Sequence, residues 1–185
     1  MVRTRGAVRL TPWGPEDFWL LRRKNAAEMT TYLGGPESEP KLLDRQRRYE
    51  ALSAREPGAG RMFRVDLVAP DGSGEPVGSI GFWEREWRGG PVYESGWGIL
   101  PEFQGRGLAV AALAELLAHL REHGTREAVH AFPGTDHAAS NAVCRRAGFT
   151  CLGPVDFEYP PGVPHPSNDW HHPLPGAARP AGAAG

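Results

Sequence analysis

The chain has 185 residues, a formal net charge of −1 and 23% charged side chains. This length favours one domain with a sizeable core, and the small net charge gives no reason to expect nucleic-acid binding. No apolar run is long enough to cross a membrane, and the first residues lack the apolar stretch of a signal peptide. The two cysteines, Cys144 and Cys151, are too few for a disulfide framework. We therefore expect a cytoplasmic protein with no membrane partner.

The first third of the chain predicts one strand and two helical segments. Residues 8–13 form the strand, and the Pro-Glu-Asp run of residues 15–17 opens a helix with the residue types that fit a first turn best. The glycines and proline of residues 33–36 end that segment. A second helix is expected over residues 41–54, whose arginines we interpret as a solvated face rather than a nucleic-acid surface.

The rest of the chain alternates between strands and helices that are separated by loops rich in glycine and proline. We expect a three-stranded meander, a helix, a strand, a helix and two closing strands, over residues 62–69, 76–86, 92–100, 109–123, 128–132, 137–147, 150–159 and 168–174. This order predicts an α/β fold with a mixed sheet and one strand–helix–strand crossover. Residues 1–174 would form the single domain. Residues 175–185, rich in Gly, Pro and Ala, would be a flexible tail.

Residues 93–124 are the most informative stretch of the sequence. A strand leads into the turn of residues 104–109, Gln-Gly-Arg-Gly-Leu-Ala, and the turn opens a helix whose apolar residues recur at helical spacing. The first N–H groups of a helix have no partner within the helix, and the helix dipole attracts anions to that end. The stretch therefore predicts a phosphate-binding site.

This turn resembles the acyl-coenzyme A loop, Gln/Arg-x-x-Gly-x-Gly/Ala, of the GNAT N-acetyltransferase superfamily. Residues 137–149, His-Ala-Ala-Ser-Asn-Ala-Val-Cys-Arg-Arg-Ala-Gly-Phe, look like the second signature of that superfamily, the Asn-x-x-Ser…Gly-Phe helix. A glycine turn alone is a weak signal, whereas both motifs at this spacing are specific. The resemblance covers residues 8–174 and implies the GNAT fold, a splayed central mixed β-sheet flanked by helices. It also implies an acetyl-CoA-dependent N-acetyltransferase.

No metal is expected, because His171 and His172, the adjacent pair nearest to His165, would face apart on a strand. The resemblance further implies which residues would bind acetyl-CoA. The backbone N–H groups of the turn would hold the pyrophosphate, and the acetyl-pantetheine arm would pair with the end of the preceding strand. The N–H group of Gly96, Gly98 or Ile99 would polarise the thioester carbonyl. The residues expected to bind acetyl-CoA are Ile99, Leu100, Gln104, Gly105, Arg106, Gly107, Leu108, Ala109, His137 and Ser140. The side chain of Arg106 would either contact the cofactor or point to water.

The reaction would be attack of a neutral amine on the acetyl thioester, helped by a base. Glu94 is our candidate base because strand alternation places it on the same face as the glycines that follow it. The alternative is a carboxylate that only pairs with a neighbouring arginine. Glu84 is the second candidate. We expect it to line the acceptor site together with Trp83 and Trp97.

Two positions depart from the family pattern. Where many members carry a tyrosine that protonates the leaving thiolate, this chain has Cys144, which we interpret as a buried structural thiol. Ser140, one turn earlier, is expected to be the acid or to hydrogen-bond the pantetheine. The usual Asn is His137, and Asn141 would substitute for it only from the other helix face.

The acceptor is predicted with less support. The subgroup that the chain resembles contains ribosomal-protein N-terminal acetyltransferases and antibiotic-modifying relatives. Three acids near the closing strands, Asp156, Glu158 and Asp169, are either ordinary surface acids or groups that would attract a cationic amine. They are the support for predicting a small cationic amine such as an aminoglycoside-type antibiotic. A protein N-terminal α-amine is the alternative. A non-catalytic acyl-CoA-binding module is the second alternative, because the tyrosine and the Asn are missing. Family members often form homodimers, and the sequence does not decide this.

Overall fold

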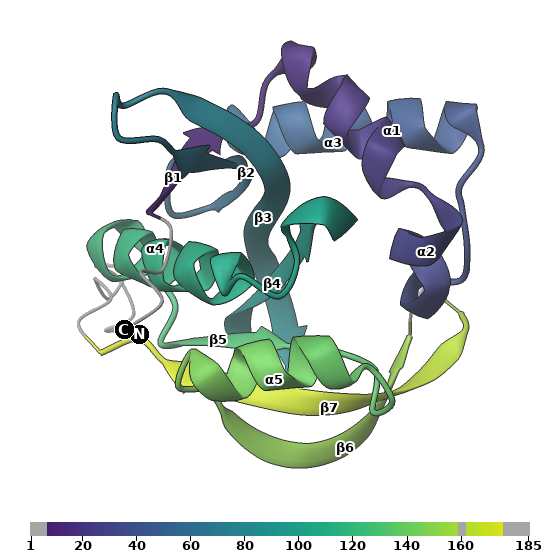
Figure 1. The fold of residues 1–185 in the computed structure, drawn as a ribbon. Helices are drawn as coiled ribbons and strands as arrows, with labels where there is room; N and C mark the ends of the chain where they lie inside the picture. The colour runs from purple at the N-terminus through teal and green to yellow at the C-terminus, as the bar shows by residue number, and fades with distance from the viewer. Residues whose placement is uncertain (1–6, 159–161, 176–185) are drawn as a thin grey trace.

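A seven-stranded sheet organises the molecule, which we describe from a computed structural model of residues 7–158 and 162–175 (Figure 1). The strand order is β1-β2-β3-β4-β5-β7-β6, and every neighbouring pair is antiparallel except β4 with β5. The strands are β1 (Val8–Pro12), β2 (Gly60–Val68), β3 (Gly74–Trp87), β4 (Gly90–Ile99), β5 (Ala128–Ala131), β6 (Thr150–Glu158) and β7 (Pro164–Pro173). The splayed mixed sheet expected from the sequence is confirmed.

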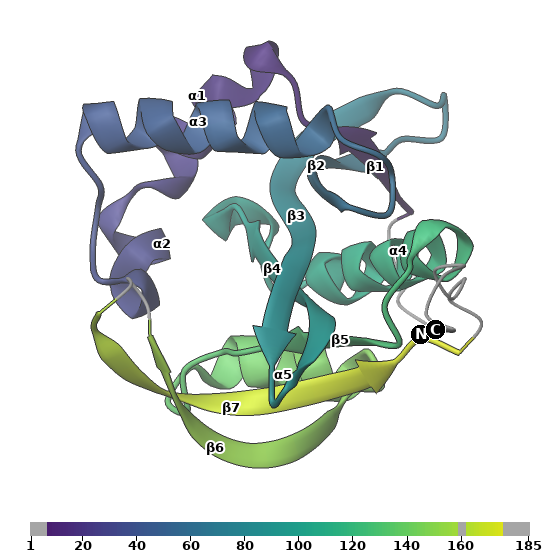
Figure 2. The same ribbon diagram turned by 180° about the vertical axis from the view of Figure 1, so that it is seen from behind.

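Helices cover both faces of the sheet. Figure 1 shows α4 and α5 in front of it, and Figure 2, from behind, shows α3 on the other side. The helices are α1 (Phe18–Lys24), α2 (Ala27–Thr30), α3 (Glu39–Ser53), α4 (Leu108–His123) and α5 (Ala138–Arg146), with short 3-10 helices at η1 (Pro15–Asp17), η2 (Thr31–Leu33) and η3 (Pro101–Phe103). Among the described residues, no helix is long and apolar enough to span a bilayer.

The apolar core is divided by the sheet into two clusters. The larger cluster lies under α4 and α5 and contains Tyr93, Ile99 and Leu116; the smaller lies under α1 and α3 and contains Leu20, Leu42 and Leu100. We call the two sides of the sheet the α4 face and the α1 face. Because side chains alternate along a strand, Ile99 and its neighbour Leu100 belong to different faces.

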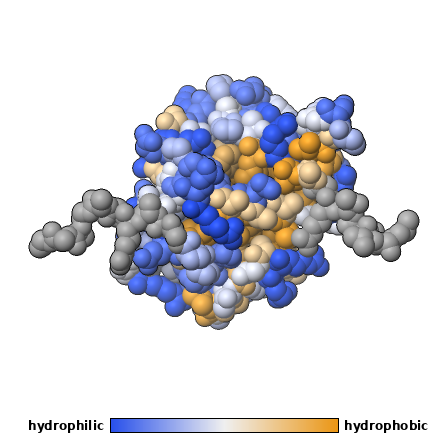
Figure 3. Space-filling view, turned by 90° about the vertical axis from the view of Figure 1, so that its left-hand side faces the viewer, coloured by the Kyte–Doolittle hydropathy of each residue, from blue (hydrophilic) through white to orange (hydrophobic). Residues whose placement is uncertain are grey.

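The edge of the molecule formed by β1 and α4 has a shallow apolar centre. Viewed from that side, hydrophobic residues lie between hydrophilic margins (Figure 3). A cavity of about 380 Å³ lies there, lined by Val8, Leu10, Phe63 and His119 and rimmed by charged residues.

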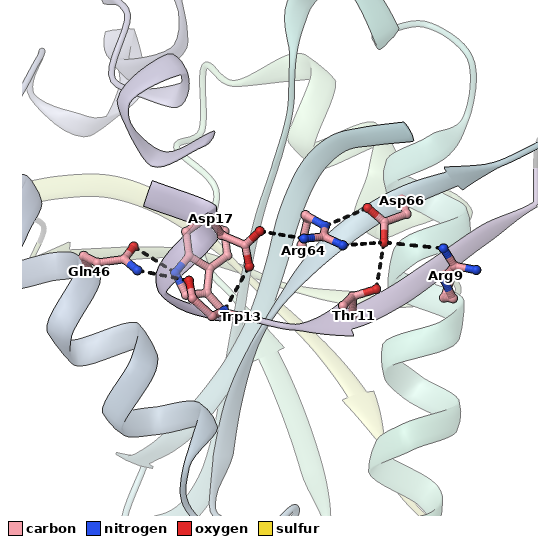
Figure 4. A network of polar contacts seen from close by, with 8 residues as sticks. Arg9, Thr11, Trp13, Asp17, Gln46, Arg64 and Asp66 are labelled. Atoms are coloured by element: carbon pink, nitrogen blue, oxygen red, sulfur yellow. Dashed lines mark hydrogen bonds and ion pairs between the residues drawn. The ribbon is translucent and has the colours of Figure 1, made fainter. Parts of the chain in front are cut away.

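A polar network holds β1, β2 and η1 together (Figure 4). Arg64 donates to Asp17 Oδ1 and to Asp66 Oδ1, both at 2.8 Å, and both aspartates are almost completely buried. Thr11 also donates to Asp66, at 2.7 Å. The two carboxylates raise the pKa of Arg64 above its ordinary value, with the Asp66 hydrogen bond the largest cause. Arg64 is thus a half-buried cation that compensates two buried carboxylates.

The element order matches the expectation, and one boundary differs clearly. The last strand was expected to begin at residue 168, but β7 begins at Pro164 and pairs there with Glu158 of β6. β5 reaches only as far as Trp170 along β7, and before it the loop of residues 133–135 bonds the same edge, where Asn168 N–H donates to Pro133 and the carbonyl of Pro166 accepts from Thr135. Residue 159 of the expected strand and residues 176–185 of the expected tail lie outside the described residues.

Candidate active site

The most distinctive feature of the sheet is a fork between β4 and β5. The two strands pair only through Tyr93 with Val129 and Glu94 with His130, within the described part of the chain. Beyond Glu94, residues 95–99 pair with β3 alone. One edge of β4 is therefore open over five residues, which is the place where an extended ligand can add to a sheet.

The hydrogen-bond alternation along β4 decides which N–H groups face this open edge. Leu100 N–H bonds the carbonyl of Val77 on β3 at 2.8 Å. In a regular antiparallel ladder every second residue points the same way, so Gly98 and Gly96 also point to β3. The expectation that either glycine offers its N–H to the thioester is wrong. The N–H group of Ile99 points to the open edge, and the Ile99 carbonyl accepts from Gln104 Nε2 at 2.8 Å.

The glycine turn opens α4 beside this edge. Gly105 and Gly107 have φ angles of +71° and +79°, and a Cβ atom built on either would meet no atom within 4 Å. The first helical bond joins Ala111 N–H to the carbonyl of Gly107 at 3.1 Å. The N–H groups of Leu108, Ala109 and Val110 have no acceptor among the hydrogen bonds of the described residues. Free donors beside empty space suit the oxygens of a pyrophosphate.

The side chains of the turn have separate tasks. Leu108 is 3% exposed and packs in the larger core cluster, so it can offer a ligand only its backbone. Ala109 is half-buried against the same cluster. The guanidinium of Arg106 lies 5.6 Å from the centre of the Phe103 ring, which holds it by a cation–π contact near the turn.

Glu94 lies on the α1 face, half-buried beside the fork. Its Oε2 accepts from Arg85 Nη1 at 2.7 Å, and its side chain is 13% exposed. Burial raises the pKa of Glu94 above the ordinary 4.5, against the opposing effect of Arg85 and a hydrogen bond from Trp83. The Glu94 carboxylate lies on the same face as Gly96 and Gly98, as a base would, and it also pairs with Arg85, as the alternative interpretation expected.

An aromatic cluster surrounds Arg85, which the sequence analysis did not identify. Its guanidinium lies 4.4 Å from the ring centre of Phe157 and within 6 Å of the ring centres of Trp87 and Phe132. Among the described residues, Arg85 Nε has no hydrogen-bond partner. The sequence signal for this cluster is the spacing of Trp83, Arg85 and Trp87 at every second position, which places their side chains on one face of a strand. In Figure 2 no described helix lies in front of β5–β7.

Two expected acceptor residues lie on the wrong face. Glu84 pairs with Tyr93, so it points to the α4 face, where it forms ion pairs with Arg126 and Arg55. It lines a separate cavity of about 280 Å³ at the end of α4. Trp97 packs against the larger core cluster on the same face. Of the expected acceptor residues, the structure brings only Trp83 beside Glu94, as its cross-strand partner.

The start of α5 lies against η2. The ring of His137 stacks on Tyr32, with ring centres 4.0 Å apart and planes 10° apart, and its Nε2 lies 3.4 Å from Ser140 Oγ. Burial lowers the pKa of His137 below 6.5. Asn141 is not free to replace the missing Asn, because it donates to the carbonyls of Gly134 and His137 and its oxygen accepts from Trp170 and Asn168.

Cys144 is fully buried, as expected of a structural thiol. Burial raises the pKa of this thiol to about 12, so Cys144 holds its proton too tightly to be a useful acid for a thiolate.

The acids near the closing strands do not form an anionic pocket. Asp156 and Glu158 are exposed and alternate with buried Phe157, so they point away from the α1 face. Asp169 is buried and its oxygens are already engaged, since it is hydrogen-bonded to His130 Nδ1 at 2.6 Å and forms an ion pair with Arg88. No group of three or more His, Cys, Asp or Glu residues suited to a metal occurs within residues 7–158 and 162–175.

Comparison with solved structures supports the fold. An acetyltransferase from Salmonella typhimurium that modifies the N-terminal serine of ribosomal protein L7/L12 superposes with a TM-score of 0.72 at 23% identity, over 91% of this chain and 95% of that one. The microcin C7 self-immunity acetyltransferase MccE, solved with acetyl-CoA and AMP, gives 0.71 at 15% identity over 91% and 93%. Aminoglycoside acetyltransferase AAC(6')-Ib, solved with coenzyme A, gives 0.66 at 19% identity over 90% and 94%.

Comparison by sequence gives a match to a family model and none to a curated protein. The model of one family, described as acetyltransferase (GNAT) domain, matches residues 7–150, which include the fork, the glycine turn and α5. The chain therefore belongs to the GNAT acetyltransferase family.

Proposed function

We propose that this protein transfers the acetyl group of acetyl-CoA to a primary amine. The observation that carries the proposal is the open edge of β4 ending at the glycine turn. An extended acyl-pantetheine arm would pair with that edge, and its pyrophosphate would reach the free N–H groups of α4. MccE, AAC(6')-Ib and a ribosomal L7/L12 acetyltransferase were each solved with acetyl-CoA or coenzyme A, which supports the same cosubstrate here.

The chain's own residues have distinct tasks in this reaction. Ile99 N–H would donate to the thioester oxygen and stabilise the negative charge that develops on it. Glu94 would accept the proton of the attacking amine, directly or through water, and burial supports this role by raising its pKa. Ser140, close to His137, would donate a hydrogen bond to the pantetheine arm or to the leaving sulfur without giving up its proton, and the thiolate would take its proton from water. Arg85 would hold the Glu94 carboxylate in place until the acceptor arrives.

The charges around the fork bear on the acceptor. The acids that favoured a small cationic amine either point away or are paired, and Arg85 is likewise paired with Glu94, whereas Lys24, which is in none of the ion pairs of the described residues, brings positive charge to the α1 face. An amine with neutral or acidic surroundings therefore fits better, and we propose the N-terminal α-amine of a polypeptide. Its ordinary pKa of about 8 also leaves a substantial neutral fraction near neutral pH. A small cationic amine is the second candidate, supported by the likeness to AAC(6')-Ib.

An amine panel tests both statements. The purified chain is mixed with acetyl-CoA and either peptides with free N-termini, of acidic or basic sequence, or aminoglycosides. Release of free thiol and the mass of each product are measured. We expect acetylated peptides, with acidic sequences preferred. Acetylated aminoglycosides without peptide products would reverse the order of the two acceptors. Binding of coenzyme A without thiol release from any amine would support a non-catalytic binding module instead.

A further inference from the structure

Lys24 is an amine of the chain itself that lies against the acyl-binding strand. It is the last residue of α1, and its Nζ hydrogen-bonds the buried hydroxyl of Ser79 on β3. Ser79 is the cross-strand partner of Gly98 on β4. A Cβ atom on Gly98 would lie 2.8 Å from Lys24 Cε and 3.2 Å from Nζ. The amine therefore occupies the space above β4 that the missing side chain of Gly98 leaves.

The position of Gly98 puts this amine on the side from which an acceptor would come. Gly98 lies on the same face as Glu94 and two positions beyond Gly96, and it directly precedes Ile99, whose N–H points to the open edge. The side chain of Lys24 is long and flexible, so rotation about its bonds can carry Nζ from Ser79 toward the edge. Lys24 is thus close to where the thioester carbon would lie.

The charge of Lys24 has no counter-ion. None of the ion pairs among the described residues includes Lys24. After burial, the next influence on its pKa is the positive charge of Arg45 on α3. Burial, and to a lesser extent Arg45, lowers the pKa of Lys24 to about 8. Near pH 8 about half of the molecules would carry the neutral, nucleophilic amine, against less than about 1% for an ordinary lysine.

We propose that Lys24 is an acetylation site of the protein itself, with bound acetyl-CoA as the donor. The Nζ lone pair forms a bond to the thioester carbon, and the bond from that carbon to sulfur breaks. Nζ gives up one proton, the sulfur takes up one proton, and the products are Nε-acetyl-lysine and coenzyme A. The step needs no other reactant. It rests on the proposed binding of acetyl-CoA at the β4 edge.

Acetylation of Lys24 would change the acceptor side of the fork. It would replace an unpaired cation with a neutral amide beside Gly98, and it would remove the positive charge that disfavours cationic acceptors. The modified and unmodified forms should therefore differ in acceptor preference, with the acetylated form more tolerant of cationic amines.

The sequence makes the test clean, because Lys24 and Lys41 are its only lysines. Lys41 lies exposed on α3 and serves as an internal control. The full-length chain is incubated at pH 8 with isotope-labelled acetyl-CoA, digested, and both peptides are quantified by mass spectrometry over time. We expect the Lys24 peptide to be labelled at least tenfold faster than the Lys41 peptide. Excess coenzyme A should suppress labelling at Lys24 and leave Lys41 unchanged.

Two variants and a binding measurement separate the outcomes. Lys24→Arg should remove the fast label, and Lys41→Arg should retain it. Equal labelling of the two lysines, or labelling of Lys24 that excess coenzyme A does not suppress, would overturn the inference. Acetyl-CoA binding by calorimetry and thiol release with external amines are measured in parallel. If both occur without label at Lys24, only this inference fails, whereas absence of binding would overturn the proposed function as well.

Discussion

Arg64 and Lys24 are both half-buried cations beside the same sheet, yet their surroundings are opposite. Arg64 lies between two buried aspartates, each at 2.8 Å, in the network of Figure 4. Lys24 has a serine hydroxyl as its hydrogen-bond partner, and within the described residues no carboxylate pairs with it. A buried charge is costly unless it is paired. The paired cation fastens β2 to η1, while the unpaired one lies at the fork, where reactivity rather than stability is the expected role.

The largest effect should come from removing Arg64, the cation that pairs with two buried aspartates. Arg64→Leu leaves Asp17 and Asp66 buried without their partner, and we expect it to lower the free energy of unfolding by about 3–5 kcal/mol. Urea unfolding followed by circular dichroism measures this. Arg47→Leu is the matched control, because its ion pair with Asp44 is exposed and worth at most about 0.5 kcal/mol. Equal losses in the two variants would mean that burial does not set the strength of these pairs.

The fork should show the reverse pattern, with large effects on rate and small ones on stability. Glu94→Gln removes the proposed base and keeps the shape of the side chain, so we expect kcat to fall by about a hundredfold or more. Stopped assays of thiol release measure kcat, and thermal melts check folding. Glu102→Gln, at an exposed acid paired with Arg23, is the control and should keep full activity. Full activity in Glu94→Gln would remove the base assignment and leave the acetyltransferase proposal intact.

The pH profile of the reaction tests the same residue independently. A carboxylate must be ionised to act as a base, and burial raises the pKa of Glu94 above 4.5. Activity should therefore be present above that raised pKa and be lost as the pH falls through it. We expect the acid limb of kcat/KM to lie above pH 4.5 and to disappear in Glu94→Gln. An unchanged acid limb in the variant would assign that limb to another group.

A smaller effect should distinguish the glycine turn from an ordinary loop. Gly107→Ala forces a side chain into left-handed backbone and into the space beside the α4 donors, so we expect KM for acetyl-CoA to rise about tenfold. Gly72→Ala, in the β2–β3 hairpin loop, has a φ of +85° and equally open surroundings. Both variants should lose about 1–2 kcal/mol of stability, but only the first should change KM. A KM change in both would point to a global effect of strain.

The last expected effect concerns the pH dependence of stability. Lys24 has a pKa of about 8 in the folded chain and about 10.4 when unfolded, so between these values the unfolded chain binds more protons. The free energy of unfolding should therefore gain a contribution, on the order of 1 to 3 kcal/mol, as the pH rises from 8 to 10.5. Denaturant titrations at several pH values measure it. Lys24→Met should abolish this gain; a gain that persists in the variant would come from other groups.

The sequence predicted the functional region well where the signal was local. The turn at Gly105 and Gly107 and the helix that follows combine positive φ angles, small residues and helical periodicity within a few residues of each other. The face of Glu94 also followed from simple strand alternation. Trp97 lies three residues beyond Glu94 on the same strand, so strict alternation alone would have placed it on the opposite face. Glu84 lies on the neighbouring strand, and only the register, which pairs it with Tyr93, shows that it points away from Glu94.

By itself, the sequence determined the order of the elements, the glycine turn and the family, because each is recorded in residues close together in the chain. Only the tertiary structure decided which groups meet at the fork. Arg85 reaches Phe157 on β6, Asp169 is bonded to His130 and Arg88, and Lys24 lies over Gly98. These contacts join residues tens of positions apart, and they depend on strand register and helix packing. No local pattern records such distances, so the charge and the reactive groups of the site appear only when the sheet is assembled.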